Sequence, residues 1–356
     1  MNAALTQPLS PSEPDPERDA GSGPQRDAGD EELESLCLAS LCKACADPLR
    51  LRILRVLRQD AMGVGELCEV LGVRQPALSH HLKLMSTVGL LGSQRDGNHI
   101  FYRRNESPGD DPAAALRQAL FAAADSLVLD ASTRERQTGL QRQREANSRD
   151  FFRDNAERFV SQRDLIAAPE RYRGAVESAL DSLAAKGGTA LEIGPGDGWL
   201  LPYLSRHFDQ VIALDNAEAM LERAAATAAE CGLGNIEFIL GDTSHERLGK
   251  IGADLAVLNM VLHHTPQPAA TLREAAEALA PGGVLLVTEL CEHQQGWARE
   301  SCGDLWLGFA PEALEKWAAE AGLRDLASSY LGQRNGFTLQ LRLFGAATDN
   351  VVKETV

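Results

Sequence analysis

The stretch Ala190-Leu-Glu-Ile-Gly-Pro-Gly-Asp-Gly198 decides the fold of the second half of this chain. Its first four residues form an apolar run interrupted by Glu192, as is typical of a buried strand. Gly194, Gly196 and Gly198 follow at alternate positions, and glycine allows positive φ angles and a close approach of a ligand to the backbone. A turn that cradles a pyrophosphate has the different spacing Gly-x-Gly-x-x-Gly. The stretch therefore predicts a strand-to-helix turn that binds another kind of ligand.

Apolar runs of strand length recur around this turn. They alternate with stretches of helical periodicity and occupy residues 190–193, 211–214, 236–240, 255–259 and 284–288. This alternation predicts an α/β Rossmann-like fold, a parallel sheet with helices on both faces. We expect the domain to span residues 151–346 and a C-terminal tail to span residues 347–356.

Polar side chains lie where the predicted strands end. Ligands of such sheets bind beyond the carboxyl ends of the strands, so these side chains are expected to converge on one crevice. Asp215 is positioned to accept hydrogen bonds from both hydroxyls of a ribose, and Asp242 to bind an adenine amino group. The complete set of expected cofactor-binding residues is Glu192, Gly194, Gly196, Gly198, Asp215, Asn216, Asp242, Thr243 and Asn259.

This ordered set, together with the turn Pro281-Gly282-Gly283, resembles that of the class I, UbiE-like S-adenosylmethionine-dependent methyltransferases. The resemblance covers residues 148–345 and implies that Gly194 and Gly196 lie beneath the methionine portion of the cofactor. Residues 151–160 resemble the segment that closes over the cofactor in that family. The resemblance implies S-adenosylmethionine as cofactor, or S-adenosylhomocysteine as an effector.

Catalysis is the open question for this half. Methyl transfer is an in-line displacement on a sulfonium, for which an enzyme mainly supplies alignment and desolvation. The candidate bases that could deprotonate a small-molecule methyl acceptor are His263 and His264, which follow the strand ending at Asn259. The alternative is that these imidazoles only cap the strand or line the pocket. The sequence thus leaves open whether the domain methylates a metabolite or senses a ligand.

The first half carries a second signature. Residues 64–71 and 75–89 are predicted helices separated by a short turn, in the manner of a helix-turn-helix, and residues 90–104 are a predicted hairpin. Between Arg74 and Arg104 the chain has five basic residues and one acidic residue, although its formal net charge is −16. This local excess of basic residues predicts binding to double-stranded DNA, with a protein-docking module as the alternative.

The expected DNA contacts are polar and basic side chains of the second helix and of the hairpin. They are Arg74, Gln75, Ser79, His80, His81, Lys83, Arg95, Arg103 and Arg104.

Four segments of this half resemble the ArsR family of bacterial winged-helix regulators: residues 46–54, 66–72, 77–85 and 99–103. We place this domain at residues 31–129. The resemblance implies a repressor that binds an inverted-repeat operator as a homodimer through its first and last helices.

Metal binding of the kinds known in that family is not expected. Arsenic-sensing members carry a Cys-x-Cys pair, but here Cys68 is followed at the second position by Val70. Zinc-sensing members place histidines on the last helix, and residues 113–129 contain none. A thiol switch using Cys42, Cys45 or Cys68 is the alternative to their packing as small core residues.

Residues 1–30 are rich in Pro, Ser, Gly and Asp and are expected to be a disordered tail, whereas residues 130–150 are expected to be a charged helical linker. Seven cysteines without a disulfide-like spacing suit a reducing bacterial cytoplasm. A signal peptide and a membrane-spanning stretch are not expected. The prediction is a multidomain transcriptional regulator whose methyltransferase domain is either a ligand sensor or an active enzyme under autoregulatory control.

Overall fold

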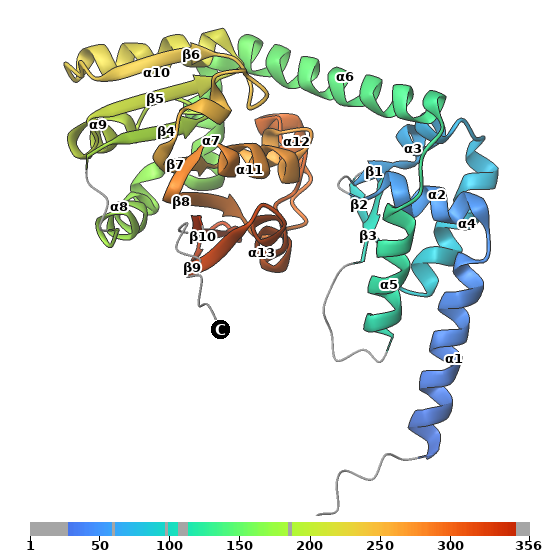
Figure 1. Cartoon of the computed structure of the whole chain (residues 1–356). Helices are drawn as coiled ribbons and strands as arrows, with labels where there is room; N and C mark the ends of the chain where they lie inside the picture. The colour runs from blue at the N-terminus through green and yellow to red at the C-terminus, as the bar shows by residue number, and fades with distance from the viewer. Residues whose placement is uncertain (1–27, 59–60, 97–98, 106–112, 184–186, 347–356) are drawn as a thin grey trace, which may run out of the picture.

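The structure is a computed structural model, and it describes residues 28–58, 61–96, 99–105, 113–183 and 187–346. The expected tail over 347–356 and nearly all of that over 1–30 lie outside this part of the chain. Figure 1 shows two domains joined by one long helix that runs along a side of the molecule. None of the described helices is both long and apolar enough to span a membrane.

The N-terminal domain is a helical core with a small antiparallel sheet of order β1-β3-β2. Its elements are α1 (Ala28–Cys45), α2 (Pro48–Val56), β1 (Met62–Gly63), α3 (Val64–Leu71), α4 (Gln75–Thr87), β2 (Leu91–Asp96), β3 (His99–Arg104) and α5 (Ala114–Asp125). Asp47 separates α1 from α2, because its side chain accepts hydrogen bonds from the backbone of Leu49 and Arg50 and so caps α2. The helix-turn-helix and hairpin are as expected.

The linking helix is α6 (Ala131–Asn155), which is longer than the expected linker over 130–150. Asp130 starts it by accepting a hydrogen bond from the backbone N–H of Thr133. Shorter elements then lead into the second domain: η1 (Ala156–Arg158), α7 (Phe159–Ala167), η2 (Pro169–Arg171) and α8 (Arg173–Asp181).

The C-terminal domain contains a seven-stranded sheet of order β6-β5-β4-β7-β8-β10-β9. Its strands are β4 (Thr189–Ile193), β5 (Gln210–Asp215), β6 (Ile236–Leu240), β7 (Ala253–Asn259), β8 (Leu279–Leu290), β9 (Leu323–Gly332) and β10 (Thr338–Ala346). The strands from β6 to β8 pair in parallel, but β10 is antiparallel to both β8 and β9. The sheet is therefore mixed, whereas a parallel sheet was expected, because β10 enters beside β8 in the opposite direction and the short connection from β9 makes a hairpin.

Helices cover both faces of this sheet, and its alternate residues divide between two hydrophobic clusters. Leu255 and Val257 belong to one cluster, whereas Ala256 and Leu258 belong to the other. The remaining helices are α9 (Leu201–His207), α10 (Glu218–Glu230), η3 (Leu248–Lys250), η4 (Leu262–His264), α11 (Pro268–Glu277), α12 (Trp297–Cys302) and α13 (Pro311–Glu320). The order of strands changes direction at β4, which places a ligand crevice beyond its carboxyl end.

Candidate functional site

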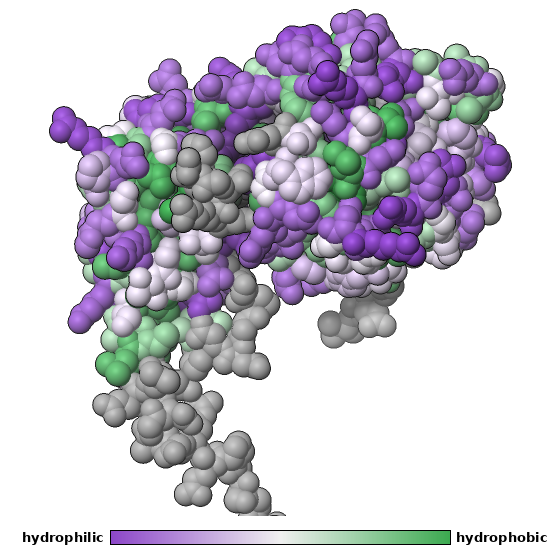
Figure 2. Space-filling view, turned by 180° about the vertical axis from the view of Figure 1, so that it is seen from behind, coloured by the Kyte–Doolittle hydropathy of each residue, from purple (hydrophilic) through white to green (hydrophobic). Residues whose placement is uncertain are grey.

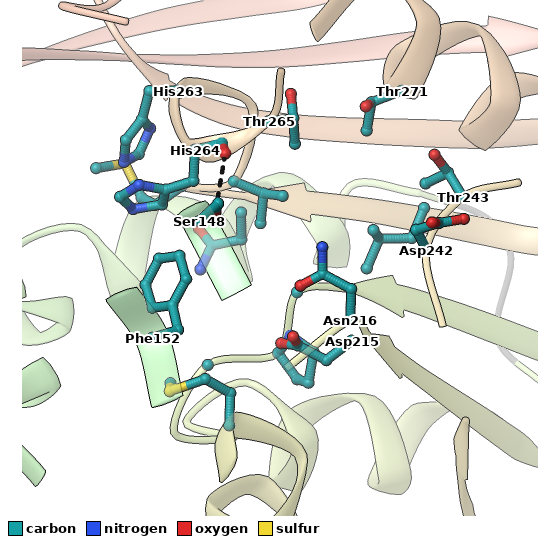
Figure 3. Close-up of a pocket in the computed structure, with 18 of the residues that line it drawn as sticks. Ser148, Phe152, Asp215, Asn216, Asp242, Thr243, His263, His264, Thr265 and Thr271 are labelled. Carbon is teal, nitrogen blue, oxygen red and sulfur yellow. Dashed lines mark hydrogen bonds between the residues drawn. The ribbon is translucent and has the colours of Figure 1, made fainter. Parts of the chain in front are cut away.

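A cavity of about 320 Å³ lies beyond the carboxyl ends of β4, β5 and β7 (Figure 3). This volume is within the range of small-molecule sites. Its lining includes seven of the expected cofactor residues: Gly194, Gly196, Asp215, Asn216, Asp242, Thr243 and Asn259. Both candidate catalytic residues, His263 and His264, also line it. Residues separated by up to 70 positions in the sequence are thus brought to one crevice.

The turn after β4 requires glycine for steric reasons. Gly194 has a φ of +67°, and a Cβ atom there would lie 2.6 Å from a methyl group of Val261. Gly198 has a φ of +77°, and its Cβ would lie 3.1 Å from the Cα of Ala224. Gly198 does not line the cavity, so its contribution is to let the turn pack against α10.

Glu192 also lies outside the cavity lining, because its side chain is buried within the sheet below the glycine turn. Burial, with a smaller contribution from the charge of Asp197, raises the pKa of Glu192 to about 8. Its Oε2 atom has no hydrogen-bond partner among the described residues. The structure therefore places Glu192 beneath the expected cofactor site rather than in it.

Asp215 ends β5 and points into the cavity (Figure 3). Its Oδ1 accepts a hydrogen bond from the backbone N–H of Ala217 at 2.9 Å, which orients the carboxylate. Burial raises the pKa of Asp215 to about 6, so the group is ionised at neutral pH. Its position and charge suit a carboxylate that accepts hydrogen bonds from ribose hydroxyls.

The cavity wall that follows β7 contains a residue with a strained backbone conformation. Met260, directly after β7, has a φ of +57° and is the one non-glycine residue with positive φ in the described part of the chain. It lines the cavity, and its backbone N–H is held by the carbonyl of Thr288 at 2.8 Å. Such strain is concentrated at functional sites, where the surrounding structure maintains it.

A buried polar cluster closes one end of the cavity. His263 Nδ1 lies 2.6 Å from Glu289 Oε1, and the backbone N–H of His263 donates to Glu289 Oε2 at 3.1 Å. Burial alone would lower the pKa of His263, but the carboxylates of Glu289 and Asp304 raise it to about 9. Burial and the neighbouring charge of His263 hold the pKa of His264 well below its usual value. The two candidate bases therefore differ: His263 is engaged by carboxylates, and His264 is neutral.

Sequence reasoning missed Asp304, Glu289 and two cavity residues of α6. Glu145 and Ser148 line the cavity, although residues 130–150 were expected to be only a linker. Their spacing of three and four residues from each other and from Phe152 places all three on one face of a helix, and this was the available signal. Asp304 lies about forty residues from His264 in an irregular segment, and no local sequence pattern predicts that the two side chains lie close together.

The expected closing segment does cover the cavity. Phe152 and Phe159 line it, and their rings lie 6.1 Å apart. Arg163 of α7 lies 2.8 Å from Asp197 in the glycine turn and thereby fastens α7 over that turn.

α6 connects this cavity to the DNA-binding domain. Near its start, Arg136 donates to the carbonyl of Val70 at 2.9 Å. At its middle, Arg144 makes hydrogen bonds of 2.8 Å to both carboxylate oxygens of Glu66 in α3. One turn later, Ser148 donates to the carbonyl of His264 at 3.4 Å, and the Phe152 ring packs edge-on against His264 with centroids 4.9 Å apart (Figure 3). A single helix thus contacts both α3 and the cavity wall.

The expected DNA-contacting side chains of α4 and its N-cap are mostly free of the protein core. Arg74, Gln75, Ser79, His80 and Lys83 are exposed, and His81 is half-buried. In Figure 1, α4 lies on the side of its domain away from the large sheet, whereas β2 and β3 face the sheet domain.

The hairpin of β2 and β3 is the wing of this domain, and the two arginines at the end of β3 lie in different environments. Arg103 is exposed but makes a bidentate ion pair with Glu292 of the C-terminal domain, at 2.6 and 2.7 Å. Beside it, the guanidinium of Arg299 lies 4.2 Å from the centre of the Phe101 ring. The wing of this structure therefore packs against the second domain.

Arg104 is a correction to the expected DNA surface. It is only 5% exposed, donates to the carbonyl of Leu54 at 2.6 Å and pairs with Asp125 at 2.6 Å. Arg104 therefore joins β3 to α2 and α5 inside the domain and is not available to a phosphate. The side chain of Arg95 lies outside the described part of the structure.

The candidate thiol switch gains no support from its surroundings. Burial raises the pKa of the Cys45 and Cys68 thiols, whereas a reactive cysteine requires a lowered pKa. Cys42 is exposed at the surface of α1.

Comparisons with known proteins match the two halves separately. The family described as "Bacterial regulatory protein, arsR family" matches residues 47–93, and that described as "Methyltransferase domain" matches residues 159–328. The "Biofilm growth-associated repressor" of Agrobacterium fabrum is 40% identical over 85 residues, which are 24% of this chain and 69% of that protein.

The second half is similar to the "Ubiquinone biosynthesis O-methyltransferase" of Parvibaculum lavamentivorans, with 30% identity over 149 residues. The match covers 38% of this chain and 58% of that enzyme. The structure of the N-methyltransferase NodS of Bradyrhizobium japonicum, in complex with S-adenosyl-L-homocysteine, matches 50% of this chain and 86% of that chain. Its identity of 21% and TM-score of 0.40 are too low to bear on function.

Proposed function

This chain belongs to the arsR family of bacterial regulatory proteins and carries a methyltransferase domain, and from this premise we propose that it is a repressor whose C-terminal domain senses S-adenosylmethionine or S-adenosylhomocysteine. Binding in the cavity beyond β4 changes the affinity of the winged helix for its operator.

The observation that carries the proposal is the double attachment of α6. The helix holds α3 through Arg136 and Arg144 and lines the cavity through Glu145, Ser148 and Phe152. A ligand that moves the cavity face of α6 therefore also moves its contacts with α3. A coupling of about 1–3 kcal/mol would change operator affinity 5–150-fold.

The two ligands differ by one methyl group and one positive charge. The cavity lining contains more carboxyl groups, among them Asp215 and Asp242, than guanidinium groups, which are those of Arg163 and Arg273, and this excess favours a positively charged ligand. Discrimination between the ligands is therefore expected to be largely electrostatic.

The test is fluorescence anisotropy of labelled DNA from the region upstream of this gene, titrated with the full chain alone and with each ligand. We expect one ligand to shift the dissociation constant for DNA at least fivefold while the other has a smaller effect. DNA binding that neither ligand changes would contradict the sensor.

An active methyltransferase is the second candidate. The cavity extends past the expected cofactor residues to His264, Cys302 and Asp304, which leaves a place for a small methyl acceptor. Release of S-adenosylhomocysteine in the presence of a small-metabolite mixture would support turnover. This outcome is compatible with a sensor, because an enzyme domain also binds both ligands.

The proposal includes a cytoplasmic homodimer on the operator. Figure 2 shows hydrophobic residues on the otherwise hydrophilic surface of the N-terminal domain. The exposed apolar side chains of the described residues include Leu36 of α1 and Val128 just after α5, which are 60% and 90% exposed. Their position supports dimer contacts through the first and last helices of that domain. Sedimentation of the full chain tests this state.

A further inference from the structure

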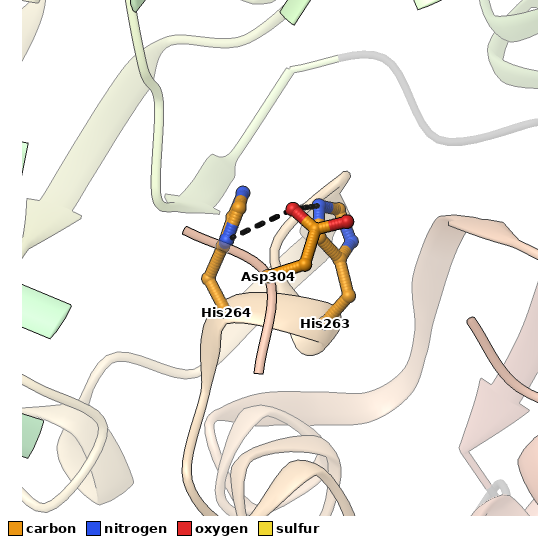
Figure 4. A group of neighbouring side chains, drawn as sticks. All are labelled: His263, His264 and Asp304. Atoms are coloured by element: carbon orange, nitrogen blue, oxygen red, sulfur yellow. Dashed lines mark ion pairs between the residues drawn. The ribbon is translucent and has the colours of Figure 1, made fainter. Parts of the chain in front are cut away.

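Three metal-ligating side chains meet at the end of the cavity (Figure 4). His263 and His264 come from η4, and Asp304 comes from the segment after α12. Asp304 Oδ1 lies 3.9 Å from His263 Nε2 and 3.7 Å from His264 Nδ1. One potential ligand atom from each residue lies within 4.8 Å of the other two. Small side-chain shifts would place the three atoms around one ion.

Glu289 orients the first of these ligands. Its Oε1 lies 2.6 Å from His263 Nδ1, so this ring nitrogen carries a proton and donates a hydrogen bond to the carboxylate. The other nitrogen, Nε2, then faces Asp304. A carboxylate that fixes the tautomer and ring orientation of a histidine is the usual support of a metal-ligating imidazole.

Asp304 provides the second, independent observation. It is 2% exposed, and neither of its carboxylate oxygens has a hydrogen-bond partner among the described residues. Buried carboxylates are ordinarily hydrogen-bonded, paired or bound to a metal. The two imidazoles form only long ion pairs with Asp304, beyond hydrogen-bond distance, so its oxygens remain available to a cation.

We propose that His263 Nε2, His264 Nδ1 and Asp304 bind a first-row divalent metal ion at the end of the cavity. Two imidazoles and one carboxylate suit zinc and its neighbours in the series, because these ions prefer nitrogen with oxygen ligands. His264 Nδ1 also lies 3.3 Å from the carbonyl of Gly303, so metal binding requires the His264 proton to move to Nε2, and it requires a charged His263 to release its Nε2 proton to solvent. This site is unrelated to the metal sites whose absence the sequence predicted.

Three protein ligands leave at least one coordination position open, and all three residues line the cavity. The ion would therefore be accessible to a second molecule bound beside the cofactor. It would bind an ionised oxygen or sulfur of that molecule, which is the type of atom that accepts a methyl group.

The test uses the full chain stripped with a chelator and titrated with Co²⁺, whose visible absorption reports coordination. We expect about one Co²⁺ per chain with nitrogen and oxygen ligands, and at least tenfold weaker binding in Asp304→Asn. His264→Gln is the second ligand variant if Asp304→Asn fails to fold. His245→Gln, which changes a histidine outside the cavity lining, is the matched control and should bind as the original chain does.

Two results would overturn the proposal. One is the absence of stoichiometric Co²⁺ binding, as expected if the cluster holds only a shared proton. The other is Co²⁺ binding that Asp304→Asn and His264→Gln leave unchanged, because the ion would then bind elsewhere. A sulfur-to-cobalt charge-transfer band would identify Cys42 or Cys45 as that other site. Calorimetry of S-adenosylmethionine binding in the presence of chelator tests the proposed sensor separately from the metal site. The ribose and adenine contacts do not involve the ion, so the cofactor should still bind if the sensor is correct and the metal site is wrong.

Discussion

Arg103 and Arg104 are adjacent in β3, and their side chains are in opposite environments. Arg103 is exposed and reaches the second domain, whereas Arg104 is buried between α2 and α5. Strand geometry points successive side chains to opposite faces of the sheet, which explains the difference. Counting basic residues in a hairpin cannot distinguish them, because the distinction depends on which face meets the helical core.

We expect Arg104→Met to destabilise the N-terminal domain by about 1–3 kcal/mol, because it leaves the buried carbonyl of Leu54 without its donor and leaves the partly exposed Asp125 carboxylate with Arg58 alone. Arg103→Met is the matched control and should cost less than about 1 kcal/mol, since its ion pair is solvent-exposed. Urea denaturation followed by circular dichroism measures both. Equal effects of the two substitutions would contradict the assignment of Arg104 to the core.

Asp215→Asn is expected to affect ligand binding and ligand-free stability in opposite directions. Loss of a charged hydrogen-bond acceptor for ribose should weaken S-adenosylmethionine binding about 10–100-fold. Without ligand, burial raises the pKa of Asp215 from 3.8 to about 6, so the ionised form destabilises the fold increasingly as pH rises through this interval. The variant should therefore melt a few degrees higher at pH 7.5, with a smaller gain near pH 4.5.

Calorimetry at several pH values provides the second part of this test. The affinity of the original chain should fall as pH decreases below about 6, where Asp215 becomes protonated. The Asn variant should lack this pH dependence. A variant that binds the ligand normally would contradict the ribose assignment.

At the scale of elements, the sequence predicts the strands and turns that depend on neighbouring residues, and it does not predict contacts that depend on the packing of distant elements. The alternation of apolar runs predicts β4 to β8, and the glycine spacing predicts the turn after β4. The strand β9 was not predicted, because most of its residues are exposed and show no alternation of buried and exposed positions. The strand β10 was also not predicted, although its leucines alternate with Gln340 and Arg342 and it is almost wholly buried. α6 was predicted as a helix, but its contacts with Glu66 and His264 depend on the packing of two domains.

Lowering the helix stability of α6 between its contacts with α3 and its contacts with the cavity should reduce the coupling between ligand binding and DNA binding. Ala146 and Asn147 lie between Arg144, which binds Glu66 of α3, and Ser148, which binds the carbonyl of His264. Replacing both by glycine lowers helix stability by about 1 kcal/mol per residue relative to alanine, and Asn147→Ala, which keeps Ala146, is the matched control that keeps the helix. We expect the ligand-dependent shift in DNA affinity to shrink severalfold in the glycine variant only. An unchanged shift, measured by anisotropy, would show that α6 does not transmit the effect.

At the scale of the whole molecule, the connections between the described domains include α6 and the contact of the β2–β3 hairpin with the segment after β8. Arg103 pairs with Glu292, and Arg299 lies over Phe101. The wing is an expected DNA-contacting element, so operator DNA and the C-terminal domain are expected to compete for Arg103. A ligand that alters the second domain can therefore act on DNA binding through both connections.

The most direct measurement of the central claim is the affinity of S-adenosylmethionine and S-adenosylhomocysteine for the full chain, free and saturated with operator DNA. Thermodynamic linkage requires operator DNA to change ligand affinity by the same factor as ligand changes operator affinity. The sensor predicts equal factors of at least fivefold for one of the two ligands. Ligand affinities that are the same with and without operator DNA would contradict it.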